Sequence, residues 1–221
     1  GMEKEVVTGI VQRVMGKNVS INLGKADAIL AENEQVRGEE FHPTEHIKVY
    51  ILEVKDTPKG PRIQVSRTHP GLVKRLFESE VAEVRDGTVE IKSIAREAGS
   101  RTKIAVWSND PDVDPVGACV GMNGARVNSI VEELRGEKID IINWDENPAI
   151  LIENALSPAK VIAVMADPEE KTALVVVPDY QLSLAIGKEG QNARLAARLT
   201  GFKIDIKSET QAKESGDLYD Y

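Results

Sequence analysis

The chain has 221 residues, of which 41% are hydrophobic and 29% charged, and its formal net charge is −8 at pH 7. This length suits two or three small domains with aliphatic cores. Because there is no long apolar run and no signal peptide, we expect neither a membrane-spanning nor a secreted protein. The single cysteine, Cys119, excludes an internal disulfide and fits a cytoplasmic location.

Residues 1–68 predict a small all-β domain. Short apolar runs, several of them strictly alternating, are separated by glycine and proline, which favours strands joined by tight turns. The five expected strands cover residues 6–14, 19–23, 28–30, 46–54 and 62–67. Five such strands suit a closed barrel. The stretch 19–30 has no aromatic residue and only Lys25 as a cation, so it offers little for base stacking.

Residues 69–147 predict the order helix, strand, strand, helix, helix, strand. Pro70 begins a helix, and its apolar face is formed by Leu72, Val73, Leu76 and Phe77. Two strands, 89–95 and 103–107, alternate around a turn at 97–100. An apolar helix at 116–120 ends at Gly121, and a second helix has a buried face of Val127, Ile130, Val131 and Leu134.

The same order repeats over residues 148–207. The turn Gly121-Met-Asn-Gly124 returns as Gly187-Lys-Glu-Gly190, 187 − 121 = 66 residues later. The strand Lys-Ile-Asp-Ile begins at Lys138 and returns at Lys203, 203 − 138 = 65 residues later. Two landmarks at nearly one spacing indicate a duplicated domain. The short link between the two repeats predicts that they pack together. For the acidic tail, 208–221, we expect disorder.

Each Gly-x-x-Gly turn joins two predicted helices. The first turn of the second helix has N–H groups without partners inside the helix, and they lie at the positive end of its dipole. Such a helix start attracts an anion, and glycines allow a sugar-phosphate backbone to come close. We therefore expect both turns to present bare N–H groups to a phosphate.

This pattern resembles the KH domain, in which a Gly-x-x-Gly loop clamps about four nucleotides of a single strand. The order of elements in both repeats is that of the bacterial type of KH domain, type II, and the barrel resembles the S-one type of OB fold. Together these resemblances imply a multidomain protein in which an OB-fold barrel precedes two α/β (α+β) KH domains. The predicted domains are 1–68, 69–147 and 148–207, followed by the tail 208–221.

The positive charge is concentrated in the second repeat. Residues 183–207 have five basic and two acidic groups, and the net charge there is 5 − 2 = +3. The other segments are neutral or acidic, with residues 142–182 at 2 − 7 = −5. We therefore expect modest RNA affinity, with the second turn supplying more of the phosphate attraction.

Longer segments resemble the bacterial NusA family of transcription termination and antitermination factors. The segments that carry the resemblance are Val65–Val73, Asp86–Lys92, Ile94–Glu97, Gly99–Trp107, Val116–Gly121 and Gly136–Ile141, and the middle block is very specific. It implies a monomeric factor that holds nascent single-stranded RNA at RNA polymerase and modulates pausing, termination and antitermination with other antitermination factors. The family's N-terminal polymerase-binding domain is absent from this chain, and Gly1 before Met2 suggests that the native chain extends upstream.

The resemblance also implies the RNA-binding residues. In the first repeat they are Gly121, Asn123, Gly124, Arg126 and Asn128. In the second repeat they are Gly187, Lys188, Gly190, Gln191, Asn192 and Arg194. Lys188 is expected to take phosphate, and Gln191 or Asn192 to reach base edges. The family usually has a basic residue at the place of Asn123, and we expect Arg126 to compensate for its loss.

An enzyme is disfavoured by the sequence. Gly187-Lys188 is followed by Glu189, so the phosphate-loop pattern of nucleotide-binding proteins is missing. His42 and His46 fall in an expected loop and strand and have no cysteine beside them, which argues against a metal site. We expect no catalytic residue and no cofactor. The alternatives are a ribosome-associated or translational RNA binder, or the RNA-binding part of an RNA-degrading phosphorylase.

Overall fold

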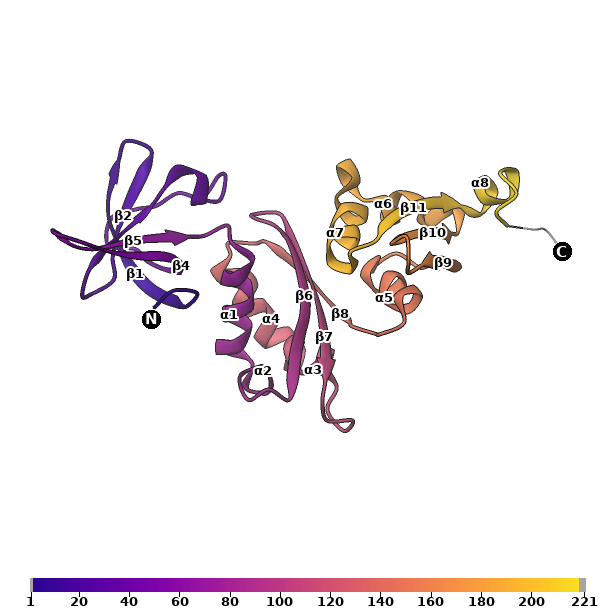
Figure 1. Cartoon of the computed structure of the whole chain (residues 1–221), viewed down its shortest axis with the longest axis horizontal. Coiled ribbons are helices and arrows are strands. Elements are labelled where there is room, and N and C mark those ends of the chain that lie inside the picture. Colours follow the sequence, from indigo (N-terminus) through magenta and orange to yellow (C-terminus); the bar gives the residue numbers. More distant parts are fainter. Residues whose placement is uncertain (1, 219–221) are drawn as a thin grey trace. The chain divides into compact units, whose positions relative to one another are not determined.

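The computed structural model describes residues 2–218, and Figure 1 traces them from the barrel strands to the C-terminal helix. Within this range the chain forms a closed barrel, two three-stranded sheets and eight α-helices. None of these helices is long and apolar enough to cross a membrane. The chain divides into two compact units: residues 1–86, 96–101 and 119–139 form the first, and residues 87–95, 102–118 and 140–221 the second.

The barrel confirms the five strands expected in residues 1–68. They are β1 (Val6–Met15), β2 (Asn18–Asn22), β3 (Asp27–Leu30), β4 (His46–Thr57) and β5 (Gly60–Ser66), with a short 3₁₀ helix, η1, at Glu32–Glu34. The sheet closes in the order β1-β2-β3-β5-β4, with β3 and β5 parallel. Alternate aliphatic side chains such as Val19, Ile21 and Val49 fill its interior.

Helix α1 (Pro70–Glu80) follows the barrel and leads to the short α2 (Ala82–Arg85). The four apolar residues predicted for its inner face, Leu72, Val73, Leu76 and Phe77, are all buried. His69 caps the helix by accepting the Gly71 N–H, and its ring stacks on Tyr50 of β4 with centroids 4.4 Å apart. A Cβ on Gly71 would lie 2.5 Å from that tyrosine ring, so the barrel and α1 meet closely here.

The first repeat (69–147) shows the predicted order. Its sheet is β6 (Val89–Glu97), β7 (Arg101–Ser108) and β8 (Lys138–Asn143), in the order β6-β7-β8. Its glycine turn lies between α3 (Pro115–Val120) and α4 (Ala125–Glu133), with a 3₁₀ segment, η2, at Met122–Gly124. Cys119 on α3 is buried, and desolvation raises its pKa to about 11, so the thiol is structural as predicted.

The second repeat (148–207) has the same order of elements. It contains α5 (Pro148–Ala155), β9 (Ala163–Asp167), β10 (Thr172–Val177), η3 (Asp179–Gln181), α6 (Leu182–Ile186), η4 (Lys188–Gly190), α7 (Gln191–Thr200) and β11 (Lys203–Ser208). Its sheet runs β11-β10-β9, with β10 and β11 parallel. Leu195, Ala196 and Leu199 form the buried face of α7, as the sequence predicted.

The two repeats share a core, which confirms that they pack together. Ala105 and Ile142 from the first sheet lie in one hydrophobic cluster with Leu151 and Ile152 of α5. Beside this cluster, the buried Lys103 ammonium contacts the Asp140 carboxylate at 2.9 Å and the Ser157 carbonyl at 2.7 Å. A buried cation is stable only with such partners, so Lys103 fixes the first sheet to the end of α5.

A second charged network lies in the first unit, around the fully buried Arg67. Its guanidinium makes two hydrogen bonds to Glu39, of 3.1 and 2.6 Å, and others to the Lys48 carbonyl and to Glu133 of α4. Burial by itself lowers the pKa of Arg67, but hydrogen bonds and charge from Glu39 and Glu133 outweigh it, and the pKa is raised. The network therefore joins three strands and loops of the barrel to α4.

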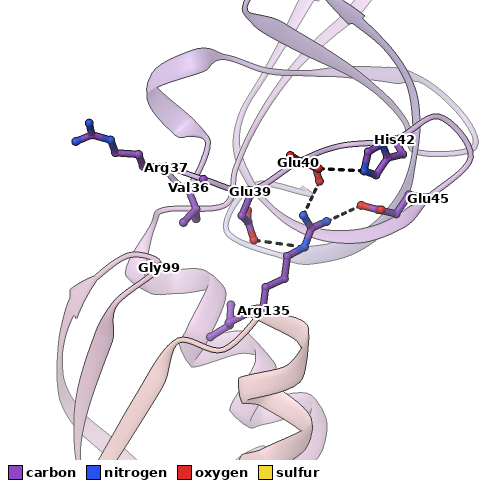
Figure 2. A pocket seen from close by; sticks show the side chains of 10 residues that line it. Val36, Arg37, Glu39, Glu40, His42, Glu45, Gly99 and Arg135 are labelled. Atoms are coloured by element: carbon purple, nitrogen blue, oxygen red, sulfur yellow. Dashed lines mark hydrogen bonds and ion pairs between the residues drawn. The ribbon is translucent and has the colours of Figure 1, made fainter.

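Arg135 extends this network at the end of α4. Figure 2 shows its guanidinium among Glu39, Glu40 and Glu45, at a cavity of about 430 Å³. The guanidinium pairs with the Glu39 and Glu45 carboxylates and donates to the Glu40 carbonyl. The cavity is thus lined mainly by charged groups that hold the barrel loop to α4.

The segment after β11 corrects the prediction of a disordered tail. Residues Glu209–Glu214 form α8, which begins with a capping box made by Ser208 and Gln211. Ala212 is buried, and the Asp179 carboxylate accepts hydrogen bonds from Thr210. The sequence does not predict this helix because its residues are mostly polar. A single buried alanine and side-chain caps stabilise it. Residues 219–221 lie outside the described range.

Removing the Arg67 side chain tests the charged network. In Arg67→Ala, the carboxylates of Glu39 and Glu133 lose the Arg67 cation, and Glu39 keeps its longer contact with Arg135 at 3.7 Å. We therefore expect unfolding to become easier by about 3 kcal/mol. Urea unfolding measures this change. Arg62→Ala, at an exposed position of β5, the strand that ends just before Arg67, is the control and should cost under about 0.5 kcal/mol. Equal small losses in both variants would contradict the structural importance of the network.

Candidate nucleic-acid interface

The two glycine turns have the same backbone conformation. The first glycines, Gly121 and Gly187, have φ/ψ of 79°/171° and 80°/169°. The last glycines, Gly124 and Gly190, have 77°/11° and 78°/10°. Between them Asn123 and Glu189 are also left-handed, at φ of 55° and 57°. The duplication therefore extends to the backbone of both loops, although their side chains differ.

The first glycine of each loop is required by packing inside the protein. A Cβ on Gly121 would lie 2.9 Å from the Arg126 backbone nitrogen, and one on Gly187 would lie 2.7 Å from that of Asn192. Neither backbone atom can move without disturbing a helix start. Gly121 and Gly187 thus let the loop fold tightly against the helix that follows it.

The last glycine of the second loop faces open space. A Cβ on Gly190 would meet only the Arg194 guanidinium, at 3.8 Å, which is ordinary contact. In the first loop a Cβ on Gly124 would lie 3.0 Å from the Asn128 amide nitrogen, an exposed side chain. Both glycines adopt a left-handed backbone that favours glycine, but only Gly190 leaves open space on its outer side, because the Asn128 side chain lies beside Gly124.

The loop N–H groups are not all bare, which corrects the sequence-based expectation. Gly190 N–H donates to the Gly187 carbonyl at 3.1 Å, and Gln191 N–H donates to the Lys188 carbonyl. The first loop makes the same bonds, from Gly124 to Gly121 and from Ala125 to Met122. Anion attraction at these loops thus depends more on the helix dipole and on side chains than we predicted.

The second loop has two cations at its surface. Lys188 and Arg194 are exposed, and the Arg194 guanidinium donates to the Glu189 carbonyl at 3.0 Å. This bond holds the arginine beside Gly190. Gln191 is half-buried at the start of α7. The arrangement suits a phosphate that lies over Gly190 between Lys188 and Arg194.

Asn192 does not reach the surface, so its predicted contact with base edges is wrong. Its side chain is 4% exposed, and its amide nitrogen donates to the carbonyls of Leu156 and Ala185 at 3.0 and 2.9 Å. These bonds join α7 to α6 and to the end of α5. Asn192 therefore supports the loop from inside.

The first loop lacks a free cation at the matching places. Met122, which is 85% exposed, is the counterpart of Lys188, and Asn128 is the counterpart of Arg194. Arg126 does not compensate as expected, because its guanidinium pairs with Glu83 at 3.1 Å. The Arg126 hydrogen bonds hold the pKa of Glu83 below its usual value. The first loop thus offers amides and a thioether to a ligand.

A groove of about 580 Å³ follows the edge strand β8 and the segment after α5. Its polar lining includes Asn143, Asn154 and Lys160, none of which the sequence had indicated. The Asn154 amide donates to the Asn143 carbonyl at 3.0 Å, while the Lys160 side chain is exposed. Asn154 and Lys160 lie 11 and 17 positions after Asn143, and the second repeat to which they belong shares a core with the sheet that contains Asn143.

The described residues contain no group of three or more histidine, cysteine or acidic side chains that could hold a metal ion. The candidate site consists of glycine loops, amides and a few cations. This chemistry fits a single-stranded nucleic acid, whose phosphates and base edges need such partners.

Comparison with protein families matches both repeats. Residues 67–144 match the model of the NusA-like first KH domain, and residues 148–214 match that of the NusA-like second KH domain. The second match includes α8, in agreement with its ordered structure.

Curated relatives match nearly the whole chain. The transcription termination/antitermination protein NusA of Bacillus subtilis is 63% identical over 97% of the chain, and that of Halalkalibacterium halodurans is 60% identical over 99%. The NusA protein of Thermus thermophilus is 49% identical over 93%. The chain spans 58%, 57% and 53% of the lengths of these three relatives. With two NusA-like KH domains and this similarity, the chain belongs to the NusA family and represents the part that contains its KH repeats.

Proposed function

We propose that this chain is the RNA-holding part of a transcription termination and antitermination factor. It binds nascent single-stranded RNA, and through this contact modulates pausing, termination and antitermination by RNA polymerase. The observation that carries the proposal is the pair of glycine loops with one backbone conformation, of which the second is open beside its last glycine, Gly190. The relatives that match nearly the whole chain are named for termination and antitermination.

The protein acts without catalysis, in the cytoplasm and as a monomer. Its partners are the RNA, RNA polymerase, reached mainly through a domain outside this chain, and other antitermination factors. The domains that we propose are the barrel, 1–68, the KH repeats, 69–147 and 148–207, and a terminal segment from 208. Copurification with RNA polymerase, in preference to ribosomes, distinguishes this function from that of a ribosome-associated RNA binder.

The two loops divide the binding energy. Phosphate lies at the second loop, where Lys188 and Arg194 neutralise it, and the groove along β8 accepts bases through Asn143 and Asn154. The first loop contributes through Asn123, Asn128 and the close approach permitted by Gly124. Its contribution depends little on salt, because Arg126 is already paired with Glu83.

Gly190→Asp places a carboxylate where the phosphate lies, so we expect at least a tenfold loss of affinity for a short single-stranded RNA. Fluorescence anisotropy measures this affinity. Gly201→Asp is the matched control, because Gly201 ends the same helix at φ +76° with open space around it. Both variants have a similar backbone strain of about 1 kcal/mol, but only Gly190→Asp should have reduced affinity for RNA. Equal affinities would remove the second loop from the site.

Lys188→Ala should flatten the salt dependence of RNA binding. Each phosphate neutralised on a single strand adds about 0.7 to the slope of log K against log salt, so the slope should fall by about that amount. Lys213→Ala removes an equal charge from α8, where Lys213 pairs with Glu209. If both variants change the slope equally, Lys188 does not contact phosphate.

Met122→Lys should give the first loop the cation that it lacks. We expect tighter RNA binding and a slope steeper by about 0.7. Met122 is a better site for this change than Asn123, because Asn123 has a left-handed backbone that asparagine tolerates better than lysine. Met122→Gln is the uncharged control. An unchanged slope in Met122→Lys would mean that phosphate does not approach the first loop.

A further inference from the structure

The two tryptophans of the chain touch each other at the end of the first sheet. Trp107 of β7 and Trp144, directly after β8, meet edge to face with ring centroids 5.7 Å apart. Trp107 is 40% exposed, whereas Ala105 and Val106 before it are fully buried. A large aromatic ring that ends a buried strand in solvent is a typical anchor at protein interfaces.

The position of Trp107 explains its exposure. Alternate residues of a strand share a face, so Trp107 continues the face of Lys103 and Ala105. Lys103 contacts the Ser157 carbonyl and Ala105 lies in the core shared with α5, so this part of the face is covered. Trp144 also packs against that core. Trp107 is therefore the first residue of this strand face that the second repeat does not cover, and the Trp144 ring contacts it edge to face.

The tryptophan pair already holds a cation. The Lys92 ammonium lies 5.1 Å from the centre of the Trp144 ring. Lys92 also pairs with Glu90 at 3.0 Å, and this contact holds the pKa of Glu90 below its usual value. An ammonium over an indole with a carboxylate beside it is a cation–π arrangement, and the exposed ring of Trp107 offers the same kind of contact.

The segments around the pair are acidic. Residues 87–95, 107–118 and 143–148 contain six acidic residues and one basic residue, Lys92. The acidic residues are Glu90, Asp110, Asp112, Asp114, Asp145 and Glu146. Ser108 bonds both to the Asp110 N–H and to its carbonyl, so the acidic loop turns directly after Trp107. These three segments together carry a net charge of 1 − 6 = −5, and Asp110, Asp112 and Asp114 are exposed, so the segments favour cations over phosphate.

We propose that Trp107, Trp144 and these acidic segments form a docking surface for a positively charged segment of a protein partner. An arginine of the partner stacks on the Trp107 ring, as Lys92 does on Trp144, and the carboxylates of Asp110 and Asp112 neutralise neighbouring cations. This surface is separate in chemistry from the glycine loops. It goes beyond RNA binding, since it gives the chain a protein-binding site of opposite charge preference.

Tryptophan indole N–H signals provide the test. The chain has two tryptophans, so a ¹H–¹⁵N spectrum shows two indole signals, and Trp107→Phe assigns them. The probe is a synthetic peptide that alternates arginine and glycine, with an alternating glutamate–glycine peptide as its control. We expect the arginine peptide to shift the Trp107 indole signal in a saturable way, and the glutamate peptide to leave it unchanged.

Two variants separate this site from general attraction to an acidic protein. The double variant Asp110→Asn with Asp112→Asn should bind the arginine peptide at least fivefold more weakly. Glu169→Gln with Glu170→Gln removes the same charge from the exposed turn between β9 and β10 and should change its affinity less than twofold. Trp107→Ala should reduce the affinity for the peptide as much as the Asp110 and Asp112 double variant does. A retained Trp144 indole signal shows that the sheet is still folded.

Three results would overturn the proposal. One is an unshifted Trp107 signal at saturating arginine peptide. Another is an equal loss of affinity in the two charge variants. The third is a Trp107 shift produced by single-stranded oligouridine but not by the peptide, which would make the surface part of the RNA path. RNA binding at Gly190 can fail without any of these results, so the two proposals are tested independently.

Discussion

Buried arginine and glutamate pairs are the constraint on which the first unit depends. Arg67 is 1% exposed, and its partners come from a barrel loop, a barrel strand and α4, which are far apart in the sequence. Breaking such a pair costs more than the pair contributes, because a charge is left in a medium of low polarity. The barrel and α4 therefore keep one mutual arrangement, which a flexible linker does not provide. The glycine loop that begins α4 inherits this fixed position.

The repeats show how one backbone can serve two chemistries. Three matched positions in the loops agree within a few degrees, so both loops offer a ligand the same backbone outline. The neighbouring side chains then decide the interaction: Lys188 and Arg194 in one copy, Met122 and Asn128 in the other. The two copies thus share the loop shape that suits a nucleotide strand, whereas only the second copy has basic side chains at these positions.

The sequence predicted the fold well because its strongest signals are local. Alternation in the barrel, the apolar face of α1 and the glycine turns each depend on residues close in the chain, and the structure confirms them. The errors concern contacts between distant segments. The sequence places Asn192 on the surface, but its amide is buried and donates to the carbonyls of Leu156 and Ala185. Likewise, the sequence does not reveal that Arg126 pairs with Glu83 of α2. The groove residues Asn143, Asn154 and Lys160 have no motif at all, so spacing alone does not reveal them.

The core shared by the two repeats has a consequence for how such proteins change over time. Ala105, Ile142, Leu151 and Ile152 lie in one cluster, and Lys103 spans its edge to reach Ser157. A cut near residue 147 therefore divides a hydrophobic interior and leaves aliphatic side chains facing water on both products. Recombination at that point exposes this interior to water, whereas recombination that keeps both repeats together preserves it. The junction between the repeats is thus a poor place to divide the chain.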